Sequence, residues 1–171
     1  CEVCARERRG DPVGRVKAGA RNQSGTASTA RLWSNPRLAV FLFGGERMRL
    51  KETIEAYRRN DPAARSGWEV FWLYNGLHAT MYYRVAHWLY EHRLRFLGRW
   101  VSQFARRRTG IEIHPAAKIG RRLVIDHGTG IVIGATTEIG DDCLLYQNVT
   151  LGGTGMTNGK RHPTLGNNVM V

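Results

Sequence analysis

The last third of the chain carries an aliphatic residue at every sixth position. The members of this series are Ile113, Ile119, Ile125 and Ile131, followed after a two-residue insertion by Ile133, Ile139, Leu145 and Leu151. An α-helix repeats after 3.6 residues and an extended strand after two, so neither element produces this spacing. A chain wound with one flat side per hexapeptide does produce it. The pattern therefore predicts a parallel β-helix over residues 111 to 171.

Smaller residues and glycines accompany the aliphatic series. Four positions after most of its members stand mainly small or β-branched residues, namely Ala117, Leu123, Thr129, Thr137, Cys143, Val149 and Val169. We expect these side chains to fill the interior beside the aliphatic ones. Glycine often follows the aliphatic position directly and allows the backbone to turn where a Cβ would clash. The chemistry is therefore expected in residues that depart from the repeat.

Residues 48 to 110 have helical periodicity and are expected to form a helical domain. A first apolar stripe ends at the punctuation Asn60-Asp61-Pro62. Two further stripes comprise Leu77, Met81, Val85, Trp88 and Leu89, and then Phe96, Leu97, Trp100, Val101 and Phe104. Stripes of this kind are core or subunit interface in most proteins. Gly110 is expected to end the last helix before the β-helix begins.

Residues 1 to 47 differ from the rest of the chain in composition. They are rich in Arg, Gly, Ser, Thr and Ala, show no sustained periodicity and precede the first methionine, Met48. We interpret them as a disordered or non-native extension without a catalytic role. Cys1 and Cys4 form a single CxxC pair with no second pair, so we predict no metal site.

The net charge of +12 raises the question of a nucleic-acid partner. Residues 1 to 47 contain nine basic and four acidic residues, and the remainder contains seventeen basic and ten acidic residues. Because this charge is spread along the chain, we expect no nucleic-acid partner. A membrane-spanning helix needs an apolar run of about 18 residues, and the sequence contains none. We therefore expect a cytoplasmic protein without membrane association.

A carboxylate and an imidazole stand together at Asp126-His127, between two aliphatic positions of the repeat. A histidine with a pKa near neutrality is well suited to remove a proton from a hydroxyl group. Glu112 lies fifteen residues earlier, and a triangular coil needs about eighteen residues. The two side chains would therefore lie on adjacent coils, where the carboxylate can orient the imidazole. An ordinary surface histidine and a junction carboxylate are the alternatives.

A glycine-rich excursion interrupts the repeat between Gly152 and Pro163. It has the glycine content of a phosphate loop, but no helix is expected after it, which argues against a nucleotide fingerprint. Arg161 offers a bidentate fork for a carboxylate, and His162 offers a second polar contact. A loop that leaves a solenoid more often carries function than packing.

Five strings occur in a fixed order in residues 48 to 171: NDPAARS, IHPAAKIG, IDHGTGIVIG, VTLGGTG and KRHPT. This set closely resembles the bacterial serine O-acetyltransferases. The resemblance implies an α+β fold, in which a helical N-terminal region precedes a left-handed parallel β-helix. It implies His127 as the general base and Glu112 as its carboxylate partner, where many relatives have Asp. The family's serine contacts correspond to Asp61, Asp126, Arg161 and His162.

The reaction implied by the resemblance is acetyl transfer from acetyl-CoA to the hydroxyl of L-serine. A backbone amide near Gly152 or Gly153 would hold the oxyanion, and the product O-acetyl-L-serine would enter cysteine biosynthesis. Acetyl-CoA is a co-substrate, and no permanently bound cofactor is implied. The resemblance further implies a homotrimer or a dimer of trimers with sites between adjacent prisms.

The sequence stops at Val171 within a hexapeptide run, so we expect it to be C-terminally incomplete. In the family, a tail beyond this point binds O-acetylserine sulfhydrylase. Two other functions remain open. A different hexapeptide O-acetyltransferase, acting on a sugar or an antibiotic, would keep His127 but would not need Asp61 and Asp126 for an amino group. A non-catalytic β-helix scaffold would keep the repeat alone.

Overall fold

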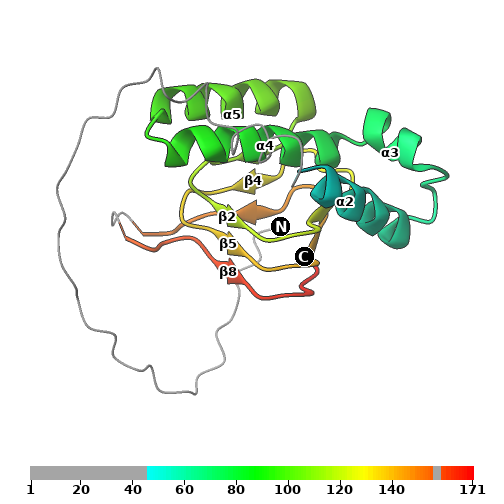
Figure 1. The fold of residues 1–171 in the computed structure, drawn as a ribbon. Helices are drawn as coiled ribbons and strands as arrows, with labels where there is room; N and C mark the ends of the chain where they lie inside the picture. The colour runs from blue at the N-terminus through cyan, green and yellow to red at the C-terminus, as the bar shows by residue number, and fades with distance from the viewer. Residues whose placement is uncertain (1–45, 156–158) are drawn as a thin grey trace, which may run out of the picture. The chain divides into compact units, whose positions relative to one another are not determined.

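The computed structural model describes residues 46–155 and 159–171, of which Met48 onward belong to one compact unit. The described residues form helices α2 (Glu46–Asn60), α3 (Gly67–Leu73), α4 (Asn75–Glu91) and α5 (Arg95–Thr109). Short strands follow: β1 (Glu112–Ile113), β2 (Lys118–Ile119), β3 (Val124–Ile125), β4 (Val132–Ile133), β5 (Glu138–Ile139), β6 (Leu144–Leu145), β7 (Thr150–Leu151) and β8 (Thr164–Leu165). The elements are drawn in Figure 1.

The change from helices to strands falls at the predicted boundary, because α5 ends at Thr109 and β1 begins at Glu112. The division of this unit into two domains at that boundary stays a prediction. The predicted extension, residues 1 to 47, lies outside the described residues except for Glu46 and Arg47, which begin α2. The Cys1 and Cys4 pair also lies outside the described residues.

The strands form three parallel sheets, in the orders β1-β4-β7, β2-β5-β8 and β3-β6. The chain visits the three sheets in turn and then returns to the first, one coil further along. Glu112 pairs with Val132, which in turn pairs with Thr150, so each coil stacks on the coil before it. This arrangement is the predicted parallel β-helix, preceded by helices.

The aliphatic series fills the interior of the coils, as predicted. Ile113, Ile133 and Leu151 occupy matching positions in the first sheet, and all three are buried. Cys143 is also buried in its predicted packing position. Thr129 is exposed, and its predicted inward position is therefore wrong. The reason is the two-residue insertion, which places Gly128 and Ile131 inside this corner instead.

Helices α4 and α5 lie side by side across the first coil of the β-helix (Figure 1). Three side-chain contacts tie them to the backbone of that coil. Ser102 Oγ donates to Ile113 O at 2.7 Å, and Tyr83 Oη donates to Ala117 O at 2.6 Å. His87 Nδ1 lies 2.7 Å from Pro115 O. Groups of the terminal coil that would otherwise lack partners are satisfied in this way.

The buried face of α5 consists of small residues, and the apolar stripe predicted to be core or subunit interface lies on the other faces of the helix. Gly98, Ser102, Ala105 and Thr109 are its buried residues. Phe96 and Trp100 are 81% and 61% exposed, so the stripe is not core within this chain. The small residues allow α5 to approach α4 closely. A Cβ built on Gly98 would lie 2.8 Å from the carbonyl oxygen of Ala86.

Periodicity does not predict helix α3, because it is only seven residues long. Its start carries a capping signal that the sequence does contain. The Ser66 side chain accepts a hydrogen bond from Glu69 N at 3.2 Å, and the Glu69 carboxylate accepts one from Arg65 N at 3.0 Å. Tyr74 follows α3 directly and also precedes the first residue of α4.

An ionic cluster joins α2 to the β-helix. The Arg122 guanidinium donates to both carboxylate oxygens of Asp142 at 2.6 Å, and it lies 3.5 Å from Glu52 of α2. The bond to Asp142 is the largest influence that raises the pKa of Arg122, and Arg122 lowers the pKa of Asp142 in return. This cluster helps to hold α2 against the first coil, and Arg122 links that coil to Asp142 of the second.

We expect the substitution Gly98→Ala to lower the free energy of unfolding by about 1 to 3 kcal/mol, because the new methyl group meets the α4 backbone. Helix propensity alone would raise stability by about 1 kcal/mol. Arg107→Ala on the exposed face of α5 is the matched control and should change stability by less than about 0.5 kcal/mol. Chemical denaturation measures both variants. An unchanged or more stable Gly98→Ala protein would contradict the close helix packing.

Candidate active site

The turn between β3 and β4 presents Asp126 and His127 on the surface. His127 has a left-handed backbone conformation, with φ of 59°, and its side chain is 76% exposed. Its Nε2 lies 3.9 Å from Asp126 Oδ1. Asp126 N donates to Leu145 O at 2.9 Å, which ties this turn to the next coil. The imidazole therefore projects from a fixed corner, where it is open to a substrate.

Asp61 reaches the same corner from the end of α2. Its Oδ1 accepts a hydrogen bond from Ala63 N at 2.8 Å, and its Oδ2 accepts one from the Tyr74 hydroxyl. The bond from Tyr74 is the largest influence that lowers the pKa of Asp61; the nearby His127 also lowers this pKa. The structure thus brings together three predicted site residues: Asp61, Asp126 and His127.

Arg161 and His162 lie at a different corner, where the chain passes from the first sheet to the second. Thr136 anchors them there. Its Oγ1 accepts hydrogen bonds from Arg161 N at 3.1 Å and from His162 N at 3.2 Å, and lies 2.7 Å from His162 Nδ1. Lys160 Nζ donates to Thr136 O at 2.6 Å. The sequence does not predict a role for Thr136, because nothing in the repeat distinguishes it from a packing residue.

The tautomer of His162 follows from its contacts. Thr136 N donates to His162 Nδ1 at 3.2 Å, so Nδ1 is an acceptor and the ring proton resides on Nε2. Burial is the main cause that lowers the pKa of His162, followed by the charges of Arg161 and Lys160. Neutral His162 can therefore donate one hydrogen bond from Nε2 to an anionic or carbonyl group.

His114 is a second histidine at this corner, and the sequence does not predict a role for it. Its Nδ1 accepts a hydrogen bond from Ala116 N at 3.0 Å. Burial lowers the pKa of His114 to about 4, with a further contribution from the Arg99 charge. The sequence does contain this histidine, within the IHP string, and that string could have drawn attention to it. The cationic side chains around it become apparent only in the folded chain.

Gly152 and Gly153 belong to this second corner, directly after β7. A Cβ built on Gly153 would lie 2.8 Å from both the Cγ and the carbonyl oxygen of Arg161. Arg161 therefore approaches position 153 so closely that only glycine fits there without a shift of the chain. The oxyanion role predicted for these glycines stays a prediction.

The first sheet separates the two corners. His127 precedes β4, whereas Thr136 and the loop it anchors follow β4. One side of a coil comprises about six residues, or roughly 20 Å at 3.3 Å per residue. Serine carries its hydroxyl and carboxylate only a few bonds apart. The His127 corner and the Arg161 corner of a single chain are therefore too far apart to hold one serine molecule.

Glu112 lies on β1, on the outer face of the first sheet. Its carboxylate pairs with Arg106 of α5 at 3.3 Å. Between the described residues, the hydrogen bonds and ion pairs do not include one from Glu112 to His127. The assignment of Glu112 as the partner of His127 stays a prediction. A contact with His127 would compete with the ion pair between Glu112 and Arg106.

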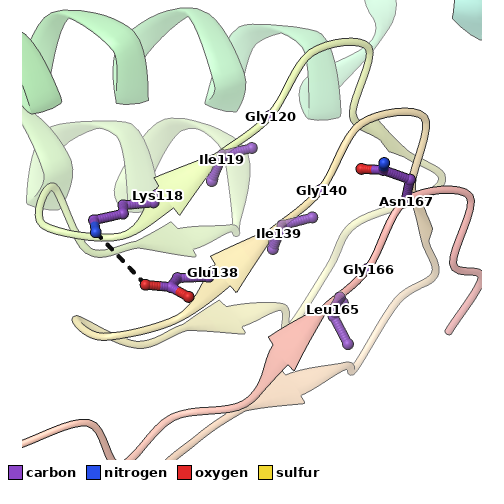
Figure 2. A pocket seen from close by; sticks show the side chains of 9 residues that line it. All are labelled: Lys118, Ile119, Gly120, Glu138, Ile139, Gly140, Leu165, Gly166 and Asn167. Carbon is purple, nitrogen blue, oxygen red and sulfur yellow. Dashed lines mark ion pairs between the residues drawn. The ribbon is translucent and has the colours of Figure 1, made fainter. Parts of the chain in front are cut away.

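A second surface feature lies on the sheet formed by β2, β5 and β8 (Figure 2). It is a shallow pocket crossed by the ion pair between Lys118 Nζ and Glu138, at 3.6 Å. Asn167 lines it at the next coil. None of the predicted site residues lines this pocket, so the candidate chemistry lies elsewhere.

Comparison with known proteins identifies relatives that show the family of this chain. No family model matches the chain. The serine acetyltransferase of Helicobacter pylori (strain ATCC 700392 / 26695) is 61% identical over 122 residues, which is 71% of each chain. The chain belongs to the serine acetyltransferase family. Its fold, helices followed by a parallel β-helix, is the one expected for this family.

Solved structures of serine acetyltransferases share the fold. The Neisseria gonorrhoeae enzyme, in complex with serine, has a TM-score of 0.73 at 30% identity, and the match covers 78% of this chain and 55% of that one. The Brucella abortus strain S19 enzyme, in complex with coenzyme A, also has a TM-score of 0.73, at 32% identity, with coverage of 77% and 52%. This chain thus spans about half the length of these solved serine acetyltransferases.

The described part of this family member contains no helix that is long and apolar enough to cross a membrane. Within the same residues, no group of three or more His, Cys, Asp or Glu side chains is arranged to hold a metal ion.

The environment of His114 predicts a pH-dependent stability. Its pKa is about 4 in the folded chain and 6.5 ordinarily, so the unfolded chain binds the proton more readily. The contribution of His114 to the free energy of unfolding should therefore be fully present above pH 6.5. It should be lost progressively as the pH decreases toward 4. His114→Asn should reduce this slope, and the exposed His92→Asn serves as the control. Denaturation between pH 4 and 8 measures it; an unchanged slope in His114→Asn would contradict the assigned environment.

Proposed function

We propose that this protein transfers the acetyl group of acetyl-CoA to the hydroxyl of L-serine, giving O-acetyl-L-serine and free CoA for cysteine biosynthesis. The observation that carries the proposal is the convergence of Asp61 with the Asp126-His127 corner. Two carboxylates beside an imidazole suit a substrate that carries both an ammonium group and a hydroxyl. A sugar or antibiotic hydroxyl has no need of the two carboxylates, so this alternative is less favoured.

His127 acts as the general base in the proposed reaction. As the serine oxygen attacks the thioester carbonyl carbon, its proton passes to the imidazole. The tetrahedral intermediate then collapses, the carbon–sulfur bond breaks, and the imidazolium returns the proton to the departing thiolate. Glu112 is proposed to stabilise the imidazolium.

The carboxylates of Asp61 and Asp126 hold the serine ammonium group in this proposal. The Asp61 side chain is ionised at neutral pH, because its pKa lies below the ordinary value of 3.8. Arg161 and His162 bind the serine carboxylate, Arg161 through its fork and His162 through Nε2–H. Amides near Gly152 or Gly153 receive the oxyanion. Acetyl-CoA is a co-substrate that leaves as CoA, and the complex of the Brucella abortus relative with coenzyme A supports it.

The separation of the two corners leads us to propose that each active site is shared by neighbouring subunits. The His127 corner of one chain would face the Arg161 corner of the next, as in a head-to-tail ring such as a homotrimer. The exposed aromatic stripe of α5, including Phe96 and Trp100, offers a further surface for pairing two trimers. A complex with O-acetylserine sulfhydrylase and a cytoplasmic location remain proposals from the sequence.

In the full chain, we expect His127→Asn to lower kcat for serine acetylation roughly a hundredfold to ten-thousandfold, the usual contribution of a positioned general base. Glu112→Gln should lower it less. The measurement is thiol release from acetyl-CoA with L-serine, compared with sugar acceptors. His92→Asn, on the exposed end of α4, is the matched control and should keep wild-type turnover. Serine turnover in His127→Asn within about threefold of wild type would refute the assignment.

A further inference from the structure

Two tyrosines lie between the end of α2 and the Asp126-His127 corner. Tyr57 comes from α2, and Tyr74 is the residue between α3 and α4. Their rings meet edge to face, with centroids 5.6 Å apart. Neither tyrosine belongs to the reaction described above, but each makes a hydrogen bond to one side of the proposed site.

Tyr57 is bonded to the catalytic corner. It is 1% exposed, and its hydroxyl oxygen accepts a hydrogen bond from Ile125 N at 3.1 Å. Ile125 immediately precedes Asp126, so this bond fixes the backbone that carries the corner. Gly76 of α4 leaves the necessary space, because a Cβ there would lie 2.6 Å from the Tyr57 hydroxyl oxygen.

Tyr74 is bonded to the other side, since its hydroxyl donates to Asp61 Oδ2. The remaining oxygen, Oδ1, accepts from Ala63 N at 2.8 Å. With one bond to each oxygen, the carboxylate cannot rotate freely about its Cβ–Cγ bond. Burial, followed by the bond to Asp61, raises the pKa of Tyr74 to about 12, so its hydroxyl remains a donor across the physiological pH range.

We propose that Tyr74 is a positioning residue for substrate recognition: it holds the Asp61 carboxylate at the angle at which it meets the ammonium group of the amino-acid substrate. Tyr57 completes the link, because it packs against the Tyr74 ring and bonds to the backbone before Asp126. The two carboxylates are thereby kept in a fixed relation although they lie 65 positions apart in the sequence. The proposal rests on the proposed function for the identity of the substrate.

The variant Tyr74→Phe removes the hydroxyl and keeps the ring that packs on Tyr57. A hydrogen bond to a charged group contributes enough that its loss should raise the serine KM about tenfold. The KM for acetyl-CoA and kcat should stay within about twofold of wild type, because neither depends on the Asp61 orientation. Steady-state thiol release with each substrate varied in turn measures this division. A fall in kcat with an unchanged serine KM would overturn the proposal.

The titration of Asp61 itself gives a readout that a purely structural role would not move. The groups acting on Asp61 are the Tyr74 hydroxyl, the Ala63 amide and His127, while Glu69 and Asp126 act on Tyr74. Because the Tyr74 bond lowers the pKa of Asp61, its loss should raise that pKa. This change must be followed at Asp61 itself and not in the acid limb of kcat/KM, because protonation of the proposed base His127 also contributes to that limb.

A double-mutant cycle with Asp61→Asn tests whether Tyr74 acts through Asp61. Tyr74→Phe should have almost no effect on the serine kcat/KM in the Asp61→Asn background. Equal effects in both backgrounds would overturn the proposal. Tyr82→Phe, on a tyrosine that packs against Phe104 of α5, is the matched control and should behave as wild type.

An NMR titration of the Asp61 carboxyl carbon separates this proposal from the proposed function. A higher Asp61 pKa in Tyr74→Phe than in wild type supports the positioning contact even if serine is not the acceptor. Failure of wild type to acetylate serine would refute the proposed function alone. An identical Asp61 pKa in the two proteins would overturn the role of Tyr74 whatever the substrate.

Discussion

Hydrogen bonding between successive coils is the constraint on which the rest of this molecule depends. Glu112 N donates to Ile131 O at 2.9 Å, and Val132 N donates to Val149 O at 3.0 Å, so the backbone of each side is committed to the next coil. Only the corners can accept extra residues without breaking these bonds. The insertion around His127 and the excursion that ends at His162 both use this freedom. The candidate chemistry therefore lies at the corners, because the backbone groups along the sides are used for hydrogen bonds between coils.

The helices convert one of these corners into a candidate site. Helix α2 is held by the ion pair between Glu52 and Arg122, and α4 begins against the backbone of Ile125. Between them, Tyr57 and Tyr74 connect the end of α2 to the β-helix. Asp61 lies at this end, and its position beside His127 is a consequence of helix packing on the first coils. Gly76 makes that packing close enough, because a Cβ there would lie 2.3 Å from the carbonyl oxygen of Ile125.

The sequence predicts the repeat well because each inward position has the same environment in every coil, so periodicity alone identifies it. It also predicts the longer helices and the residues of the His127 corner. It does not predict which helical face is buried, since Gly98 and Ser102 are less conspicuous than Phe96 and Trp100. Contacts made by side chains distant in sequence are equally hidden. Thr136 binds His162 across 26 positions, and Tyr74 binds Asp61 across 13. Local patterns carry no record of such pairs.

The most direct test of this account is complementation between two inactive subunits. His127→Asn removes the base at one corner, and Arg161→Ala removes the fork at the other. If active sites are shared between neighbours in a ring, mixed oligomers contain sites in which both corners are intact. An equal mixture that assembles at random should then regain up to about a quarter of wild-type serine acetylation, although each variant alone is nearly inactive. Verified mixed oligomers that show no gain over the separate variants would contradict the shared site.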